Sequence, residues 1–387
     1  MVNRRLLRVK AFQQLYAFWT QERAQHQLAF DELTHIFQPD LSLMVAKEEQ
    51  MPRLEGLRKL AEIQLTEFFQ GIPTEESIPE ESLQAAKSVY KTYQNNTKKI
   101  AIHLKKEMVT EVEKIYHAYL KILFYIQNLS QIANWDEQRR LLETPLKTSQ
   151  FCQNKVLAIL PKWKELQQAF ADYHIGWSED EETRLKKLFI EAILVDETFI
   201  SYLPKSGENF AQDIEMIRYL LKNFLLKHPM MAEYFEEKDL NWHLNKDVIK
   251  SLSTKTFKVD ALEDLSLQVL ALQWEDDKRF FEDLFEGSIE MDGELNTWVG
   301  EQTKNWESDR LAMSDFILLK MAVTEMIKFP SIPVKVSINE YIELAKNYST
   351  PKSGQFINGI LDVISNRLVI EKVIQKSGRG LIDIASK

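Results

Sequence analysis

The first ten residues contain four cationic side chains and no acid, and the cations are Arg4, Arg5, Arg8 and Lys10. Guanidinium groups match phosphate oxygens in charge and in hydrogen-bond geometry, so a cluster of arginines is suited to an anionic ligand such as a nucleic-acid backbone. Arg4 and Arg8 are four residues apart, which places them on one side of a helix. The alternative is a basic terminus that is merely solvated.

A second basic segment lies at the other end of the chain. Residues 331–387 contain eight Lys or Arg against five Asp or Glu, whereas residues 11–330 carry a net charge of −16 within a chain of net charge −9. If folding brings the two basic segments together, they form a local anion-attracting surface on an otherwise acidic protein.

Two helices with defined starts are predicted in the C-terminal region. Ser337 and Glu340 have the spacing of a capping box, in which each side chain accepts from a backbone amide of the other, and Val336 and Tyr341 can pack together over it. Thr350 is a suitable cap for the next helix, because Pro351 would then occupy its first position.

The last predicted helix has one clear apolar stripe and one aromatic side chain outside it. The stripe consists of Ile357, Ile360, Leu361, Ile364 and Leu368. Phe356 lies about 100° away from that stripe, in the same direction as Val363. This face is either a second packing surface of a bundle or a surface aromatic that stacks on an unpaired base.

The sequence contains no recognisable catalytic or metal-binding motif. Glu32 and His35 form a single E-x-x-H motif, whereas a di-iron bundle needs two such motifs and two further carboxylates. The seven histidines are scattered, and no glycine-rich loop indicates a nucleotide site. We therefore expect no enzyme activity and no cofactor.

The composition favours an all-α protein of the cytoplasm. The chain has 387 residues, 44% of them hydrophobic, with only 11 Gly and 11 Pro. Its single cysteine, Cys152, excludes an internal disulfide and fits a reducing compartment. The start of the sequence lacks the apolar core of a secretory signal, and no uncharged apolar run is long enough to span a membrane.

The hydrophobic pattern predicts helices over residues 3–29, 41–70 and about 80–130, with a linker at 71–79. A helical hairpin then recurs 32 residues later and again 64 residues after that, with turns near Asp196, His228 and Asp292. The Asn241-Trp242 pair matches Asn305-Trp306, which favours duplication for the second and third copies. For the first copy, duplication and chance are equally good explanations.

Three segments resemble the NusB family of transcription antitermination factors. The first contains Arg4-Arg5-Leu6-Leu7-Arg8, the second runs from Asp309-Arg310-Leu311 to Met326, and the third contains the sequences IPVK, INE, ELAK and FINGILD between Ile332 and Asp362. The resemblance covers residues 1–29 and roughly 275–370. The long segment between them resembles an extended form of the family.

The resemblance implies an all-α fold of NusB-like bundles enlarged by inserted helical hairpins. The implied parts are an Arg-rich helix (1–29), a helical insertion (30–274), a C-terminal bundle (275–370) and a flexible basic tail (371–387).

The resemblance also implies binding of boxA-like single-stranded RNA together with the ribosomal protein NusE, within the transcription elongation complex. It implies that RNA lies near Arg4, Arg5, Arg8, Ser353 and Phe356. We add Lys352 to these RNA candidates, although its residue type departs from the family pattern. The resemblance places Tyr16 and Asp315 nearer the protein partner. The alternative is a helical interaction scaffold that has lost RNA binding, which the acidic middle of the chain would suit.

Overall fold

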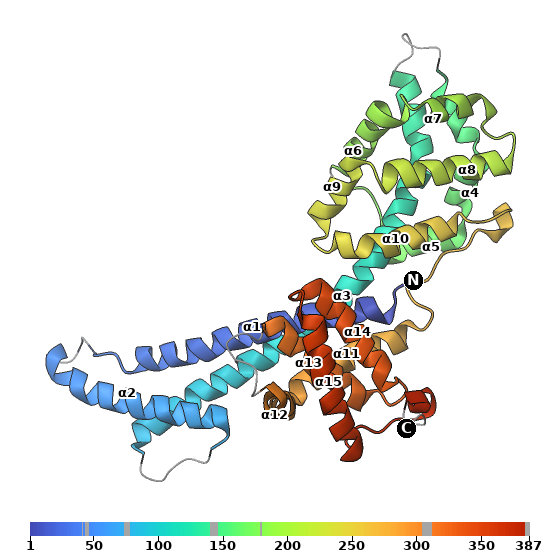
Figure 1. Cartoon of the computed structure of the whole chain (residues 1–387). Coiled ribbons are helices and arrows are strands. Elements are labelled where there is room, and N and C mark those ends of the chain that lie inside the picture. Colours follow the sequence, from blue (N-terminus) through green and yellow to red (C-terminus); the bar gives the residue numbers. More distant parts are fainter. Residues whose placement is uncertain are drawn as a thin grey trace. The chain divides into compact units, whose positions relative to one another are not determined.

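The computed structural model describes residues 1–40, 42, 46–72, 78–139, 146–178, 180–303 and 312–383, and all regular structure in these ranges is helical (Figure 1). The all-α prediction is confirmed. The chain divides into two compact units, one made of residues 1–4 and 110–277 and the other of residues 5–109 and 278–387. We call them the middle unit and the terminal unit.

The terminal unit begins with an arm of three helices. They are α1 (Arg4–Ile36), α2 (Lys47–Gln70) and the first part, to Val109, of the 60-residue helix α3 (Glu80–Arg139). Small and branched side chains such as Leu33, Leu65 and Ala86 form the buried seam between them. Gly71 ends α2 in the left-handed conformation, at φ 70°, which glycine adopts without strain. α1 extends seven residues beyond the predicted end at residue 29.

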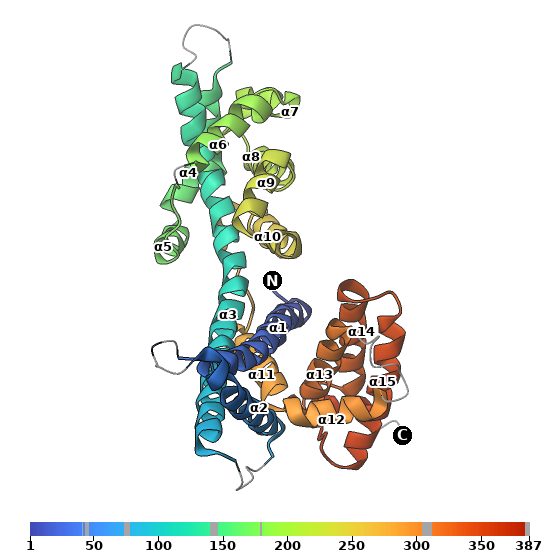
Figure 2. The ribbon, with the colours of Figure 1, turned by 90° about the vertical axis from the view of Figure 1, so that its left-hand side faces the viewer.

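The rest of the terminal unit is the C-terminal bundle. It contains α11 (Trp274–Glu290, from Lys278 onward), α12 (Asp292–Thr303), α13 (Met313–Lys328), α14 (Val334–Tyr348) and α15 (Ser353–Ile370). Helices α13, α14 and α15 pack against one another, and α12 packs against both α13 and α15 (Figure 2). All five residues of the predicted stripe on α15 are buried, as expected.

The predicted start of α14 is wrong by four residues, because the N-cap is Pro333 and not Ser337. The helix begins at Val334, so Ser337 lies inside it, and the Ser337 hydroxyl donates to Glu325 Oε1 at 2.7 Å instead of capping a backbone amide. Val336 is exposed and Tyr341 is fully buried, so the two do not pack as a staple. A tertiary partner, invisible to local sequence patterns, decided the position of Ser337.

The start of α15 also differs from expectation. The helix begins at Ser353, and Thr350 and Pro351 lie in the turn before it. The Thr350 amide donates to Ser353 Oγ at 3.2 Å. The side chain of the first helical residue thus accepts from the turn, whereas the prediction had the Thr350 side chain accepting from the helix. Helix ends commonly shift by one or two residues, but here the residue predicted to accept from a helix amide instead donates its own amide to a helix side chain.

The segment after α15, predicted as a flexible tail, makes defined contacts through residue 380. The Lys376 ammonium donates to the Phe329 carbonyl at 3.1 Å, and the Ser377 amide donates to the Pro330 carbonyl at 3.0 Å. Gly380 lies so close to the Pro330 carbonyl that a Cβ atom there would clash at 2.0 Å. Gly380 itself belongs to a short 3-10 helix, η8 (Gly378–Asp383). Burial lowers the pKa of Lys376 to about 8.

In the middle unit, short helices surround the second part of α3 (Figure 1). In chain order they are η1 (Thr148–Gln153), α4 (Lys155–Ile159), η2 (Leu160–Lys162), α5 (Lys164–Asp172), α6 (Glu181–Leu188), η3 (Phe189–Ile193), α7 (Glu197–Tyr202), η4 (Leu203–Lys205), α8 (Phe210–Leu220), η5 (Leu221–Leu225), α9 (Pro229–Lys238), α10 (Trp242–Thr256) and η6 (Leu262–Asp264). The Lys121 ammonium, in the second part of α3, donates to Glu181 Oε2 at 2.7 Å, and Tyr234 also donates to Glu181. This buried pair ties α3 to α6 and α9.

The predicted helical hairpins are present in all three places. Asp196 caps α7, accepting from the Phe199 amide at 2.9 Å, His228 precedes α9, and Asp292 begins α12. In the first two copies a π-helical turn ends the first helix: η3 at 189–193 and η5 at 221–225, separated by the predicted 32 residues. The third copy continues as a regular α-helix, α11.

The structural likeness is therefore greatest between the first and second copies. The sequence analysis instead relied on the Asn-Trp pairs to relate the second and third. Trp242 is buried against Phe235, with ring centroids 4.3 Å apart and planes at 14°. Residues 305 and 306 lie outside the described residues, so the structure does not compare the two pairs.

Candidate nucleic-acid interface

Arg8 is a buried residue that joins the first helix to the C-terminal bundle. Its Nε and Nη2 atoms donate to the two carboxylate oxygens of Glu325 at 2.7 and 2.8 Å, and both side chains are almost fully enclosed, with 4% and 0% exposed. Tyr341 donates to the same carboxylate at 3.0 Å. Burial alone would lower the pKa of Arg8, but the bonds and charge of Glu325 raise it above its ordinary value. The pair therefore holds α1 against α13.

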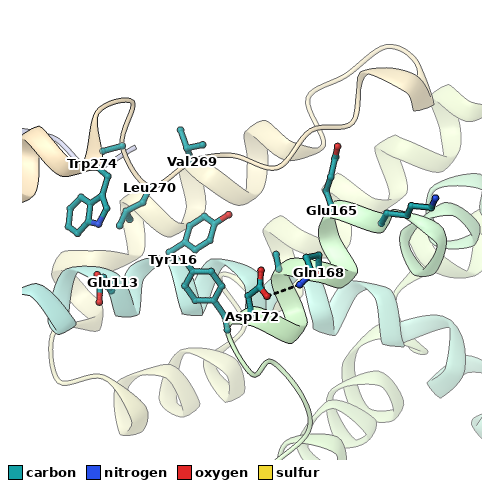
Figure 3. A pocket seen from close by; sticks show the side chains of 12 residues that line it. Glu113, Tyr116, Glu165, Gln168, Asp172, Val269, Leu270 and Trp274 are labelled. Atoms are coloured by element: carbon teal, nitrogen blue, oxygen red, sulfur yellow. Dashed lines mark hydrogen bonds between the residues drawn. The ribbon is translucent and has the colours of Figure 1, made fainter.

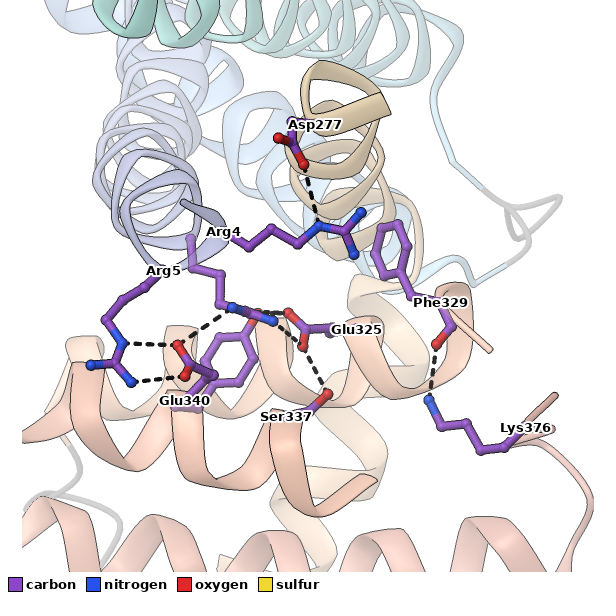
Figure 4. A network of polar contacts seen from close by, with 10 residues as sticks. Arg4, Arg5, Asp277, Glu325, Phe329, Ser337, Glu340 and Lys376 are labelled. Carbon is purple, nitrogen blue, oxygen red and sulfur yellow. Dashed lines mark hydrogen bonds and ion pairs between the residues drawn. The ribbon is translucent and has the colours of Figure 1, made fainter. Parts of the chain in front are cut away.

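Arg5 lies one helical turn earlier and remains partly exposed. Its Nε and Nη2 donate to Glu340 on α14 at 3.0 and 2.8 Å, a bidentate pair (Figure 4). The Arg8 Nη1 also reaches Glu340, at 3.4 Å. Because a guanidinium has five N–H groups and the Glu340 pair uses two, Arg5 retains donors that an added phosphate could accept.

Arg4 belongs to the middle unit, where its Nε donates to Asp277 Oδ1 at 3.3 Å. Lys10 is buried, with 1% of its surface exposed. Asp277, Glu340 and Glu325 thus pair with Arg4, Arg5 and Arg8, of which only Arg8 is buried. These acids largely neutralise the predicted excess of positive charge at the N-terminus. They lie more than 270 residues away in the sequence, so the local pattern did not reveal them.

The Arg5–Glu340 pair predicts a specific dependence of stability on pH. The bonds from Arg5 lower the pKa of Glu340 below its ordinary value of 4.5. A carboxyl with a lowered pKa stabilises the fold above its unfolded pKa, and that stabilisation is lost as the pH falls through the folded value. We expect Arg5→Ala to lower the free energy of unfolding at about pH 7 and to have little effect near pH 3.

Urea unfolding of both proteins at the two pH values measures this difference. Arg53→Ala, which removes an exposed ion pair with Glu81, is a matched control for the loss of an arginine. An Arg5→Ala effect of the same size at both pH values would contradict the assignment.

The start of α15 holds the other predicted site residues, and they have different environments. Ser353 is buried and its hydroxyl donates to Asp315 Oδ2 at 2.8 Å, while Asp315 is itself buried at the start of α13. Lys352 is exposed and Phe356 is half-buried. Val363, which shares the direction of Phe356, is 51% exposed, so this face of α15 is open to solvent at Val363 and partly covered at Phe356.

The two ends of the sequence meet along α14. The Arg5 side chain reaches Glu340 in the middle of α14, and the Phe12 ring packs against Tyr348 at the end of that helix, with centroids 5.6 Å apart. Lys352 follows four residues after Tyr348, in the turn that leads into α15. The first helix therefore packs along the second half of α14, and the start of α15 follows the end of that same helix. Over that distance α14 rises about 12 Å, at 1.5 Å per residue.

Tyr16, one turn beyond Phe12 on α1, is 44% exposed, and its ring lies 6.4 Å from that of Phe12. Of the two residues expected near a protein partner, Tyr16 is thus accessible and Asp315 is not. In this conformation Arg8 and Ser353 are also enclosed, so their side chains position other groups and do not present a surface for a ligand.

Sequence reasoning missed the acidic partners of the arginines. Glu340 was assigned to a cap, and Glu325 was not singled out. One signal was available: Glu325 is the single charged residue in the apolar run from Met321 to Ile327 of α13. An isolated acid on a helix that is otherwise buried all round needs a buried cation, and Arg8 is that cation.

These features define a helical-bundle protein whose basic first helix is joined to its C-terminal helices by buried ion pairs. Residues 240–366 match the model of the NusB family. This C-terminal part of the chain is a NusB-family domain. The match begins earlier than the sequence analysis expected, because it includes α10 of the middle unit.

Relatives with the name transcription antitermination protein NusB align with this chain at high identity over a short length. The protein of Chloroherpeton thalassium is 46% identical over 94 residues, which is 24% of this chain and 44% of the relative. The protein of Salinibacter ruber is 45% identical over 103 residues (27% and 64%), and that of Natranaerobius thermophilus is 43% identical over 74 residues (19% and 53%).

The chain spans about half the length of the curated relatives it matches. No solved structure matches the chain. Among the described residues, no helix is long and apolar enough to cross a membrane, and no cluster of three potential metal ligands occurs.

Proposed function

We propose that this protein is a non-enzymatic adaptor of transcription antitermination in the cytoplasm that binds boxA-like single-stranded RNA together with the ribosomal protein NusE. The observation that carries this proposal is the match of residues 240–366 to the NusB family, with relatives named for antitermination. The docking of the arginine-bearing helix on α14 of the same domain supports it, because it joins the two basic ends of the sequence in one bundle.

In this proposal the accessible residues contact RNA and the buried ones hold them in place. Arg4, Arg5 and Lys352 would donate to phosphates, and the Phe356 ring would stack on an unpaired base. Arg8 would fix the position of Arg5 through their shared partner Glu340, and Ser353 with Asp315 would fix the start of α15. Arg8 and Ser353 were expected near RNA and Asp315 near the protein partner; because all three are buried, we propose a positioning role for them instead.

The exposed Tyr16 would belong to the surface that binds NusE, two turns along α1 from Arg8. An adaptor of this kind works by holding an RNA and a protein at once. Each bound partner then raises the apparent affinity for the other, by the same factor in both directions.

The test is RNA binding by the double variant Arg4→Ala with Arg5→Ala. Fluorescence anisotropy with a labelled boxA-like RNA should show weaker binding than wild type. Since each neutralised phosphate contributes about 0.7 to the slope of log K against log salt for a single strand, the slope should fall by about 1.4. Lys91→Ala with Lys99→Ala, two exposed cations on α3 of the terminal unit, is the matched control.

An unchanged affinity and an unchanged salt slope in the arginine variant would remove α1 from the RNA surface. If the wild-type protein also fails to bind RNA with NusE present, the chain is instead a protein-interaction scaffold.

A further inference from the structure

A groove of about 710 Å³ lies within the middle unit, and none of its lining residues is among those assigned to RNA (Figure 3). The second part of α3 forms its floor, α5 and the following Tyr173 form one wall, and residues 269–274 form the other. Its lining is Glu113, Tyr116, Lys164, Glu165, Gln168, Ala169, Asp172, Tyr173, Val269, Leu270, Ala271 and Trp274. This volume is in the range of pockets that hold a ligand or a few side chains.

Hydrogen bonds and buried side chains fix both walls. The Gln268 amide donates to the Tyr119 hydroxyl at 3.1 Å, and the Val2 amide donates to the Leu270 carbonyl at 2.8 Å. On the other side, Gln167 on α5 donates to Gln127 on α3 at 2.8 Å. Phe170, buried on α5, packs edge-on against a ring of α3. The groove is therefore preformed, which reduces the entropy lost on binding.

Several apolar side chains at and beside the groove are exposed. Val269 is 51% exposed, and Leu272, in the same segment, is 81% exposed. Tyr173 is also exposed, and its ring meets that of Tyr116 edge-on at 5.1 Å. A left-handed residue, His174 at φ 52°, turns the chain after Tyr173. Clustered exposed apolar groups of this kind mark an interaction surface.

Acidic groups predominate among the charges at the groove. Its lining contains three carboxylates and one lysine. Asp172 accepts from Gln168 at 2.7 Å, and neither Asp172 nor Glu113 forms an ion pair within the described part of the chain. Burial raises the pKa of Tyr173, and the charges of Glu113 and Asp172 raise it further, so both carboxylates act on that ring.

We propose that this groove binds a short basic segment of a partner protein. An apolar side chain of that segment would pack against Tyr116 and Trp274, and an adjacent lysine or arginine would lie near Glu113 and Asp172. The occupant follows from charge complementarity: carboxylates without a cationic partner attract a cation, while the aromatic rings provide apolar area and a face for it. The same charge repels a polyanion, so RNA is not the ligand of this groove.

The test uses the full chain and a defined probe. The probe is a mixture of fluorescein-labelled hexapeptides, each with one Lys or Arg flanked by Leu, Val or Phe, and a second mixture carries Glu in place of the cation. Anisotropy should show binding of the basic mixture, weakening with salt, and none of the acidic mixture. Glu113→Gln with Asp172→Asn should weaken binding about tenfold, which corresponds to 1.4 kcal/mol.

Two further variants separate the groove from general charge. Val269→Lys places a cation at an exposed position of the groove and should abolish binding of the basic peptides, whereas Leu240→Lys, at a 92% exposed position outside it, should leave their affinity within twofold of wild type. Glu236→Gln with Asp247→Asn, two exposed acids of the same unit, is the control for the double variant. Equal losses in groove and control variants, or no binding of the basic mixture by wild type, would overturn the proposal.

Neither outcome depends on RNA or NusE, so failure here leaves the antitermination proposal untouched.

Discussion

Replacing Glu325 by leucine should lower the free energy of unfolding of the terminal unit by about 3–5 kcal/mol, the range for removing one partner of a buried ion pair. The reason is the charge left behind. Arg8 is 4% exposed, and without Glu325 its remaining acceptor is Glu340, at 3.4 Å from Nη1. Ser337 and Tyr341 also lose the acceptor that each of their hydroxyls uses.

Urea unfolding measures this loss, and a double-mutant cycle assigns it to the pair. Arg8→Met should be destabilising as well, but Arg8→Met combined with Glu325→Leu should be more stable than the sum of the single changes predicts, because no uncompensated charge remains. Glu371→Leu, at an exposed position just beyond α15, is a control for the substitution itself. A loss below about 1 kcal/mol for Glu325→Leu would show that the pair does not hold α1 in place.

The second large effect concerns Phe356 and RNA. Phe356→Leu should weaken binding of a boxA-like RNA by about 1–3 kcal/mol, the value of one base stacked on an aromatic ring. Leucine keeps an apolar side chain at this half-buried position, so the fold should be retained, while the flat ring is lost. Phe356→Tyr keeps the ring and should bind nearly as wild type does.

Val363→Ala provides the matched control, because Val363 lies in the same direction on α15, seven residues further along, and is exposed. Affinities measured by anisotropy at one salt concentration allow a direct comparison. Equal affinity of the leucine variant and wild type would mean that Phe356 does not stack on a base and that its side chain serves packing alone.

Much of the fold follows from local pattern. Apolar residues spaced three and four apart correctly predicted the buried stripe of α15. The turns at Asp196, His228 and Asp292 lie where the repeat predicted them. Such features depend on neighbours within one or two helical turns, which a single sequence displays directly. The π-helical turns η3 and η5 were not predicted, since an amphipathic pattern looks the same with or without one wider turn.

The candidate site could be predicted only in part, because its electrostatics are tertiary. The sequence showed arginines close together near residue 5, but their counter-charges lie on α11, α13 and α14. Capping rules assigned Glu340 and Ser337 to each other. In the structure Glu340 instead binds Arg5, and Ser337 binds Glu325. The need to compensate a buried charge therefore outweighs a local capping preference.

The central claim is that one RNA strand contacts both the start of α1 and the start of α15. Ultraviolet cross-linking of a 4-thiouridine boxA-like RNA to the full chain, followed by mass spectrometry of the peptides, tests it most directly. The account predicts cross-links in peptides that contain Arg5 and in peptides that contain Phe356, both suppressed by unlabelled RNA of the same sequence. Specific cross-links found only on helices of the middle unit, such as α8 or α9, would contradict it.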